Sequence, residues 1–385
     1  MRFEEIPGFQ SFKQLLVSSV INNHISHAQI FSGPEGSAAL PLALAYARYI
    51  MCEDKQVNDS CQHCKSCIKF RKYIHPDLHF SFPSNMDGLK SEDVKSSIYI
   101  AEWRKALLAN PYLNLEEWSS YMDLGSKTPL IPAGEALEII KSLQLVSVEN
   151  EYKLMLIWLP EKMNDSAANK ILKTLEEPPP KTILFLITAD YENLLETIRS
   201  RAVMHRVQNF RPVDAANVLI EKFDANPETA GKLSEIAEGN IADALWMLRE
   251  GEAMANQLDL FRSWMQYCFG FKIDELLNLS EKLSKNHKRD WFKSYLTYAT
   301  FMIRQSMLMN HSPELNRLSN EEADFINKFR QFFHHGNYLQ ITDYIEDAIT
   351  HIHRNASSKI VFFDLSLLIA DLFRKEKTMR QMASH

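Results

Sequence analysis

Four of the five cysteines in this 385-residue sequence fall within sixteen residues, at Cys52, Cys61, Cys64 and Cys67. Four thiolates at short spacing can close a tetrahedral Zn²⁺ site that has no open position, so such an ion would be structural. An iron–sulfur cluster can also use a Cys-x2-Cys-x2-Cys run, but its usual continuation is Cys-x3-Cys-Pro, whereas Ile68 follows Cys67 here. Free thiols are the third possibility. The spacing favours zinc.

A second stretch has the outline of a phosphate-binding loop. Residues 27–32 are typical of a short strand, and Gly33 follows it. The pattern Gly-x4-Gly-Lys-Ser/Thr calls for a second glycine, a lysine for the β/γ phosphates and a hydroxyl for Mg²⁺. Ala38, Ala39 and Leu40 occupy those three positions. The sequence therefore predicts a degenerate loop that has the architecture without the chemistry, comprising Gly33, Gly36, Ala38, Ala39 and Leu40.

The stretch from Lys153 to Val207 contains the elements that must position these residues. Apolar runs at 154–159 and 183–188 have the length and composition of strands buried on both faces. A helix between them is expected to begin after a cap at Asn164 or Asp165 and to end at the run of three prolines that follows. A second amphipathic helix is expected to end at Ser200-Arg201-Ala202. Alternation of strands and helices at this spacing predicts a parallel βαβ unit.

Residues 167–179, Ala-Ala-Asn-Lys-Ile-Leu-Lys-Thr-Leu-Glu-Glu-Pro-Pro, resemble the signature of bacterial clamp-loader subunits, a branch of the AAA+ ATPases. Ser200-Arg201-Ala202 resembles the Ser-Arg-Cys motif of the same family. The resemblance extends over roughly residues 1–250 and implies an α/β AAA+ core, with a parallel sheet and flanking helices. The family also inserts a zinc module at the place of the four cysteines.

The resemblance locates two further positions of the ATP chemistry. Trp158 and Leu159 stand where active members carry an acidic pair that holds the metal, and neither can coordinate a hard cation. Glu161, two residues later, is expected to point elsewhere. Ala242 stands where active members carry an arginine that reaches the γ-phosphate. Three sites have thus lost their charge, which predicts a chain that neither binds ATP well nor hydrolyses it.

Arg201 is the predicted functional charge. In the resembled family this arginine projects across a subunit boundary to ATP held by a neighbour, and a guanidinium fork matches phosphate oxygens. A cation placed favourably at a helix C-terminus is the structural alternative. Arg199 and Arg206 are lesser candidates.

Three domains are predicted. The AAA+ core spans residues 1–209 and contains the zinc module at about 52–67 and an insertion at about 85–132. A small helical lid spans 210–250, and an all-α collar domain for oligomerisation spans 251–385. The insertion is expected to be helical near 97–109. Its aromatic residues could stack on bases, but a small local core is the simpler expectation for Trp103, Tyr112, Trp118 and Tyr121.

Bulk composition limits the function classes. The formal net charge is −6 and 45% of the residues are hydrophobic, which argues against a surface dominated by phosphate binding. No signal-peptide core and no run approaching the roughly 20 apolar residues of a membrane span occur. A cytoplasmic protein with no membrane partner is expected.

The function implied by the resemblance is a non-catalytic subunit of the five-subunit DNA polymerase III clamp loader, which places the sliding clamp on primed DNA. Its implied partners are the ATPase subunits (gamma/tau) and the delta subunit, with clamp and primer-template DNA reached through the complex. One alternative is an active AAA+ ATPase or ATP-gated switch. The other is a stand-alone zinc-containing nucleic-acid-binding protein.

Overall fold

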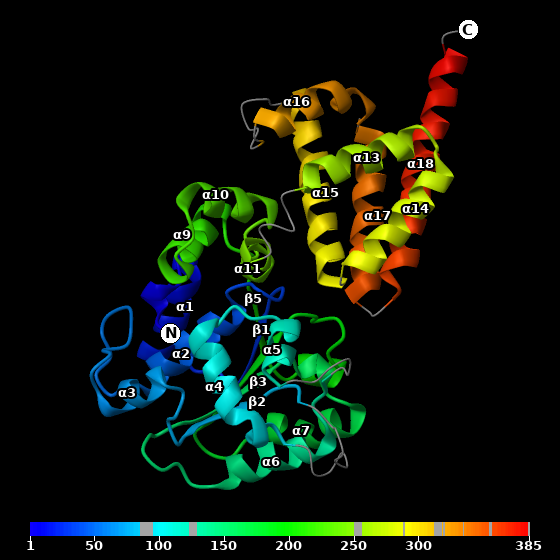
Figure 1. Cartoon of the computed structure of the whole chain (residues 1–385). Coiled ribbons are helices and arrows are strands. Elements are labelled where there is room, and N and C mark those ends of the chain that lie inside the picture. The colour runs from blue at the N-terminus through cyan, green and yellow to red at the C-terminus, as the bar shows by residue number, and fades with distance from the viewer. Residues whose placement is uncertain are drawn as a thin grey trace. The chain divides into compact units, whose positions relative to one another are not determined.

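The computed structural model describes residues 1–84, 95–122, 129–249, 256–287, 289–311, 318, 320–333, 335–353 and 356–383. The chain divides into two compact units, which are considered separately (Figure 1). Unit 1 comprises Met1–Ala230 and Glu238–Ala242, and unit 2 comprises Gly231–Ala237 and Asp243–His385. The division into core, lid and collar stays a prediction.

Unit 1 is built on a five-stranded sheet in the order β2-β3-β4-β1-β5, and every strand pair is parallel. The strands are β1 (Ala28–Ser32), β2 (Leu78–Ser81), β3 (Lys153–Trp158), β4 (Thr182–Thr188) and β5 (Val203–Arg206). All residues of β3 and β4 are buried. The predicted parallel βαβ unit is confirmed. Because the strands are parallel, their carboxyl ends meet at one edge of the sheet, where α/β folds place their ligands.

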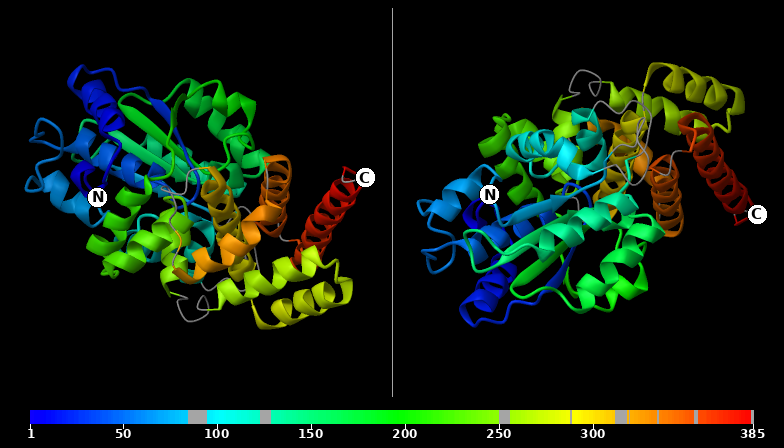
Figure 2. Two further views of the ribbon diagram at one scale, coloured as in Figure 1. Left: turned by 90° about the horizontal axis from the view of Figure 1, so that it is seen from above. Right: turned by 90° about the horizontal axis from the view of Figure 1, so that it is seen from below.

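Helices cover both faces of this sheet (Figure 2). The helical elements of the first 230 residues are η1 (Phe3–Glu5), α1 (Gln10–Ile21), α2 (Ala39–Met51), α3 (Lys65–Arg71), η2 (Ser96–Tyr99), α4 (Ile100–Ala109), α5 (Leu115–Tyr121), α6 (Ala133–Gln144), η3 (Pro160–Lys162), α7 (Asp165–Glu176), α8 (Glu196–Arg199) and α9 (Pro212–Phe223). Ile139 of α6 and Ile171 of α7 join the strands in one apolar core. On α2, Tyr46 stacks on Phe185 of β4 with ring centroids 5.3 Å apart.

Helix α7 forms as its sequence predicts, and α8 does not. Asn164 caps α7 by accepting a 2.8 Å hydrogen bond from the backbone N–H of Ala167. The amphipathic helix expected before Arg201 is only one turn, Glu196–Arg199. Asp190 accepts a hydrogen bond from the N–H of Asn193, 3.3 Å away. Such local side-chain bonds offer the backbone an alternative to a helix.

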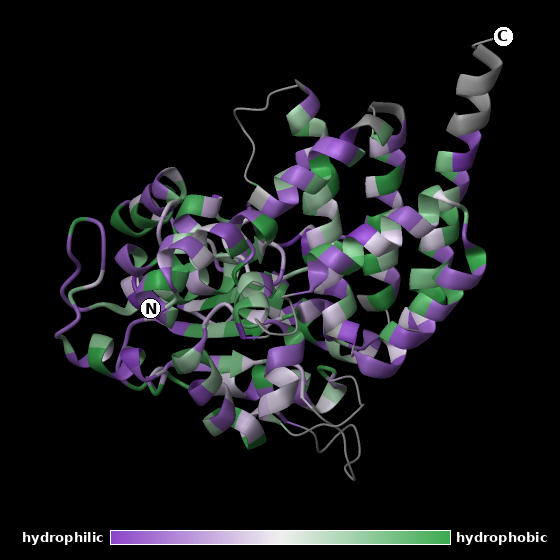
Figure 3. Ribbon diagram, turned by 45° about the horizontal axis from the view of Figure 1, so that its top comes forward, coloured by the Kyte–Doolittle hydropathy of each residue, from purple (hydrophilic) through white to green (hydrophobic). Residues whose placement is uncertain are grey.

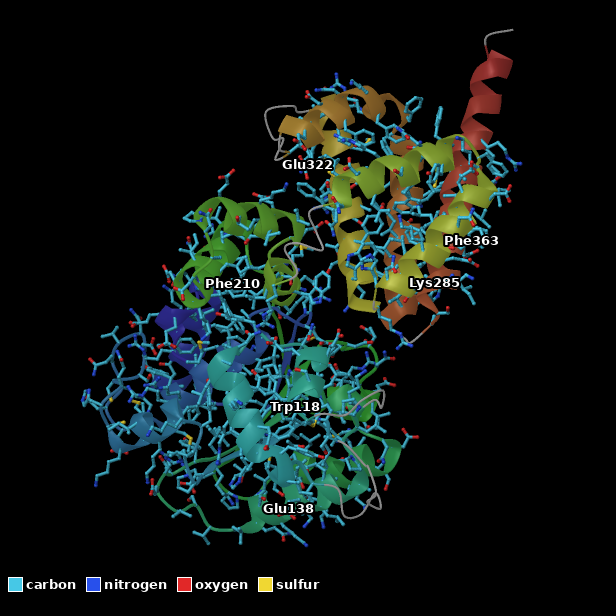
Figure 4. The ribbon with its side chains drawn as sticks, viewed as in Figure 1. Trp118, Glu138, Phe210, Lys285, Glu322 and Phe363 are labelled. Atoms are coloured by element: carbon cyan, nitrogen blue, oxygen red, sulfur yellow. The ribbon has the colours of Figure 1, made fainter. Side chains whose placement is uncertain are left out.

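The described part of the insertion forms its own aromatic core beside β2 and β3. Trp103, Tyr112 and Trp118 are each no more than 1% exposed, and Figure 4 labels Trp118 among the interior side chains. The Trp118 indole donates a 2.7 Å hydrogen bond to the carbonyl of Pro83, and Trp103 packs against Trp158. The local-core expectation is confirmed, and base stacking by these three buried rings is excluded. Residues 85–94 and 123–128 of the insertion lie outside the described residues.

The rest of the described chain is helical. The elements are α10 (Pro227–Ile236), α11 (Ile241–Arg249), α13 (Gln257–Phe269), α14 (Ile273–Asn286), α15 (Arg289–His311), α16 (Asn320–Phe329), η5 (Arg330–Phe332), α17 (His335–His353) and α18 (Ser358–Ala383). In unit 2 the hydrophobic residues alternate with polar ones along each helix (Figure 3), and Trp264, Tyr295 and Phe362 are among those in its core. Across the described residues, no helix is both long and apolar enough to span a membrane.

Asp77 ties the loop before β3 to the start of β2. Its buried carboxylate accepts backbone hydrogen bonds from Val148, Glu149 and Asn150 at 2.6, 2.8 and 2.8 Å. Burial by itself raises the pKa of Asp77, but these three hydrogen bonds outweigh it and lower the pKa below the ordinary 3.8.

Replacement Asp77→Asn should lower the free energy of unfolding by about 2 kcal/mol at neutral pH, since an amide cannot satisfy three donors as a carboxylate does. A depressed pKa contributes stability above about pH 4 that is lost as the pH falls through the folded value. The deficit of the variant should therefore shrink toward pH 3. Urea unfolding across that range checks this, with exposed Glu177→Gln as the control. A pH-independent deficit would contradict it.

Candidate metal centre and degenerate phosphate site

The structure brings the four cysteines of the motif together. Their sulfur atoms all lie within 4.8 Å of one another, and those of Cys61 and Cys67 are 4.0 Å apart. Helix α2 ends at Met51, directly before its C-cap Cys52, and Cys64 is the N-cap of α3. A turn of chain between these helices carries Cys61.

Backbone groups are directed at the sulfur atoms. The N–H of Cys61 donates to Cys52, that of Cys64 to Cys61, and that of Cys67 to Cys64, at 3.3 to 3.4 Å. Hydrogen bonds of this kind stabilise thiolates, the form in which cysteine binds metals. Hydrogen bonding from the Cys52 thiol lowers the pKa of Cys67 and correspondingly raises that of Cys52. His63 faces the Cys61 carbonyl and Asp54 instead.

The donor set fits one tetrahedral ion. Zn–S bonds of about 2.3 Å put the sulfur atoms of a tetrahedron about 3.8 Å apart, close to the 4.0 Å found here. A disulfide needs about 2.05 Å, and an iron–sulfur cluster, with several irons between its thiolates, needs wider spacing. Cys52, Cys61, Cys64 and Cys67 can therefore hold a metal ion, and their geometry is compatible with structural zinc.

Replacement Cys64→Ser should lower bound zinc from about one ion per chain to well below one and reduce the thermal midpoint, because a structural ion contributes folding free energy. Chelator treatment of the unchanged protein should lower the midpoint similarly. Atomic emission and thermal unfolding measure both. Cys268→Ala, at the buried cysteine of α13, should retain its metal; a full zinc content in Cys64→Ser would refute the site.

The degenerate loop lies at the carboxyl edge of the sheet, where β1, β3 and β4 end. The pocket there contains most of the loop together with the residues at the predicted acidic-pair position, and it is lined by Gly33, Pro34, Glu35, Gly36, Ser37, Ala39, Leu40, Pro111, Tyr112, Leu113, Trp158, Leu159, Ile187, Thr188 and Ala189. Leu159 has a left-handed backbone with φ 53°, a conformation that non-glycine residues adopt rarely.

The insertion fills this pocket. Tyr112 and Leu113 are buried against the loop, and the N–H of Leu115 donates a 2.6 Å hydrogen bond to the carboxylate of Glu35 within it. The space that remains is about 20 Å³, which is room for roughly one water molecule. A nucleotide requires many times that volume.

The charges around the pocket are of the wrong sign for phosphate. Among the described residues that line it there is no lysine or arginine. Glu161 is not among the residues that line the pocket, and its carboxylate accepts hydrogen bonds from Thr188 Oγ1 at 2.8 Å and from the Ala189 N–H at 2.9 Å. Burial raises its pKa to about 7, to which the nearby Glu35 carboxylate adds.

Ala242 lies beside the loop. Gly36 has φ +80°, and a Cβ there would fall 2.7 Å from the Cβ of Ala242 and 2.1 Å from the side-chain oxygen of Asn240. The side chain of Asn240 donates a 2.9 Å hydrogen bond to the carbonyl of Glu35. The three positions where sequence analysis expects missing charges are therefore gathered around one loop.

Arg201 lies just beyond α8 with 34% of its side chain exposed. Its Nε and Nη2 contact the Glu176 carboxylate at 2.7 and 2.5 Å, and its Nη1 donates to the Thr197 carbonyl at 2.8 Å. Arg199 is instead paired with Glu192. Arg201 is thus both accessible and held in one orientation by the end of α7.

Comparison with known proteins agrees with this architecture. The model of the family described as "DNA polymerase III, delta subunit" matches residues 9–211, more than half of the chain. The chain belongs to this family. The predicted resemblance to clamp-loader subunits of the delta prime type is confirmed.

Individual relatives lead to the same group. The chain is 30% identical over 239 residues to the DNA polymerase III subunit delta prime of Bacillus subtilis (strain 168), covering 62% of this chain and 59% of that protein. It is 28% identical over 190 residues to the delta prime subunit of Escherichia coli (strain K12), covering 49% and 45%. The tau subunit of Bacillus subtilis is 22% identical over 262 residues, covering 67% and 39%. The matches thus span two fifths to three fifths of these relatives.

Two features escaped the sequence reasoning. No local signal in the sequence indicates that Tyr112 and Leu113 line the pocket, because the spacing of residues in the insertion does not predict which edge of the sheet it covers. Arg48 does have a local signal in the sequence. It is the single charge in the helix Ala39–Met51 and it lies four residues before Cys52.

Proposed function

We propose that this protein acts as a delta prime-like, non-catalytic subunit of the DNA polymerase III clamp loader in the cytoplasm. It would help to load the sliding clamp on primed DNA, together with ATPase subunits of the gamma/tau type and a delta subunit. Residues 210–250 would form its lid and residues 251–385 the collar through which the complex assembles. Zinc would hold the module around Cys52–Cys67.

The observation that carries this proposal is the filled pocket beside the phosphate loop. A space of about 20 Å³, lined by Glu35 and by no lysine or arginine among the described residues, offers ATP neither room nor counter-charge. An ATPase or an ATP-gated switch is therefore disfavoured. The subunit would instead contribute to ATP hydrolysis only through Arg201, held near the surface by Glu176 and presented to a nucleotide on a neighbour.

Two changes should be needed before this chain binds ATP. Restoring the loop with Ala38→Gly, Ala39→Lys and Leu40→Thr supplies the ligands but not the room, whereas Tyr112→Ala with Leu113→Ala supplies the room but not the ligands. Neither set alone should give binding by calorimetry below millimolar ATP, and the combination should. Circular dichroism establishes that each variant folds.

The control for the opened pocket is Leu108→Ala, at an exposed position on α4. It should leave the restored loop unable to bind. ATP binding by the unchanged protein, or by the restored loop alone, would contradict the proposal that the insertion closes the site.

Replacement Arg201→Ala should lower clamp- and DNA-stimulated ATP hydrolysis at the neighbouring site by at least 100-fold, since an arginine finger contributes about 10³–10⁵ in kcat. Arg201→Lys should restore little, because a lysine lacks the planar fork. The assay uses the reconstituted complex, with assembly confirmed by gel filtration and Arg199→Ala as the control. Full ATP hydrolysis by an assembled Arg201→Ala complex would contradict this role of Arg201, and the subunit would then be purely structural.

A further inference from the structure

Arg48 is a buried charge on the helix that joins the two candidate sites. Helix α2 is buried along its whole length, and Arg48 is its single charged residue, with only 2% of its surface exposed. A guanidinium cannot lose its proton in a protein. Removing such a charge from water costs several kcal/mol unless an opposite charge accompanies it.

No carboxylate of the described residues forms an ion pair with Arg48, although its charge is near enough to Glu5 to help lower the pKa of that carboxyl. None lies within 4 Å of the Arg48 guanidinium, and the Nε of Arg48 has no hydrogen-bond partner there. Glu5 is already engaged by the backbone N–H of Arg2 at 2.9 Å and by the chain's amino terminus at 3.6 Å. Arg48 lies one helical turn before Cys52 on α2, and it is among the groups that lower the pKa of the Cys67 thiol.

We propose that Arg48 is the counter-charge of the metal centre. Four thiolates around one divalent ion carry two net negative charges, and a centre buried against α2 must have them balanced. Arg48 lies in the final turn of α2, four residues before the ligand Cys52 that follows this helix. The buried guanidinium also favours an anionic tetrathiolate centre over four neutral thiols, which would leave Arg48 without a partner.

This assignment gives the centre a role beyond holding its own loop. The first residue of α2 directly follows the degenerate phosphate loop, and its last precedes Cys52. Pairing Arg48 with the centre fixes the C-terminal end of that helix. The metal would therefore help to hold the loop in place from the far end of α2.

The test compares Arg48→Met, Arg48→Lys and Arg71→Met in the full-length protein. Arg71 is exposed and lies on α3, the helix that carries Cys67, so it is the matched control. Zinc affinity is measured by competition with a chromophoric chelator, and the ligand set by the thiolate-to-Co²⁺ absorption of the cobalt-loaded protein. Arg48→Met should bind zinc about 10–100-fold more weakly, as loss of an outer-shell partner does. The zinc affinity of Arg48→Lys should fall by only a few fold, and that of Arg71→Met should not change.

Thermal unfolding with and without metal separates this role from packing. With zinc, Arg48→Met should unfold at a lower temperature than the unchanged protein. After chelation it should unfold at the same temperature or higher, because the unpaired buried charge is gone. An equal loss of stability in both states would make Arg48 a packing residue. Unchanged zinc affinity in a folded Arg48→Met protein, or no zinc binding by the unchanged protein, would overturn the proposal.

Discussion

Burial of helix α2 along its entire length is the constraint on which both candidate sites depend. A helix leaves four unpaired N–H groups at its start and four unpaired carbonyls at its end, and α2 has no solvent-facing side that could relieve them. In a nucleotide-binding relative the phosphates would meet the amino-terminal N–H groups. Here the Ser37 hydroxyl accepts from the N–H of Ala39, and the chain itself closes the space beyond. At the other end, the carbonyl of Cys52 accepts from Lys55 and the cysteine cluster follows.

Part of the insertion lines the pocket beside the degenerate loop. Tyr112 and Leu113 are buried there, and the Trp103–Trp118 pair of the same insertion, with ring centroids 5.0 Å apart, is buried as well. A bound nucleotide can dissociate, whereas a segment of the same chain is present at an effectively fixed concentration. In the function proposed above, this segment would hold the loop in one conformation without a nucleotide.

Local signals predicted the regular elements well. The apolar runs gave the strands β3 and β4, Asn164 capped α7, and the prolines ended it, since each depends on residues a few positions apart. The prediction failed at α8, which is a single turn. There the side chain of Asp190 accepts a hydrogen bond from the N–H of Asn193, and this contact leaves no periodic trace in the sequence.

The sequence by itself determined which chemistry is possible: four thiols at metal-binding spacing, a loop without its lysine and hydroxyl, and a motif arginine at position 201. These follow from residue type and local spacing. Only the tertiary structure decided that the insertion lines the pocket beside the degenerate loop, that Arg201 pairs with Glu176, and that the sulfur atoms of the four cysteines come within 4.8 Å of one another. Each of these contacts joins residues from different elements, and their meeting depends on how helices pack against a parallel sheet, which local sequence does not encode.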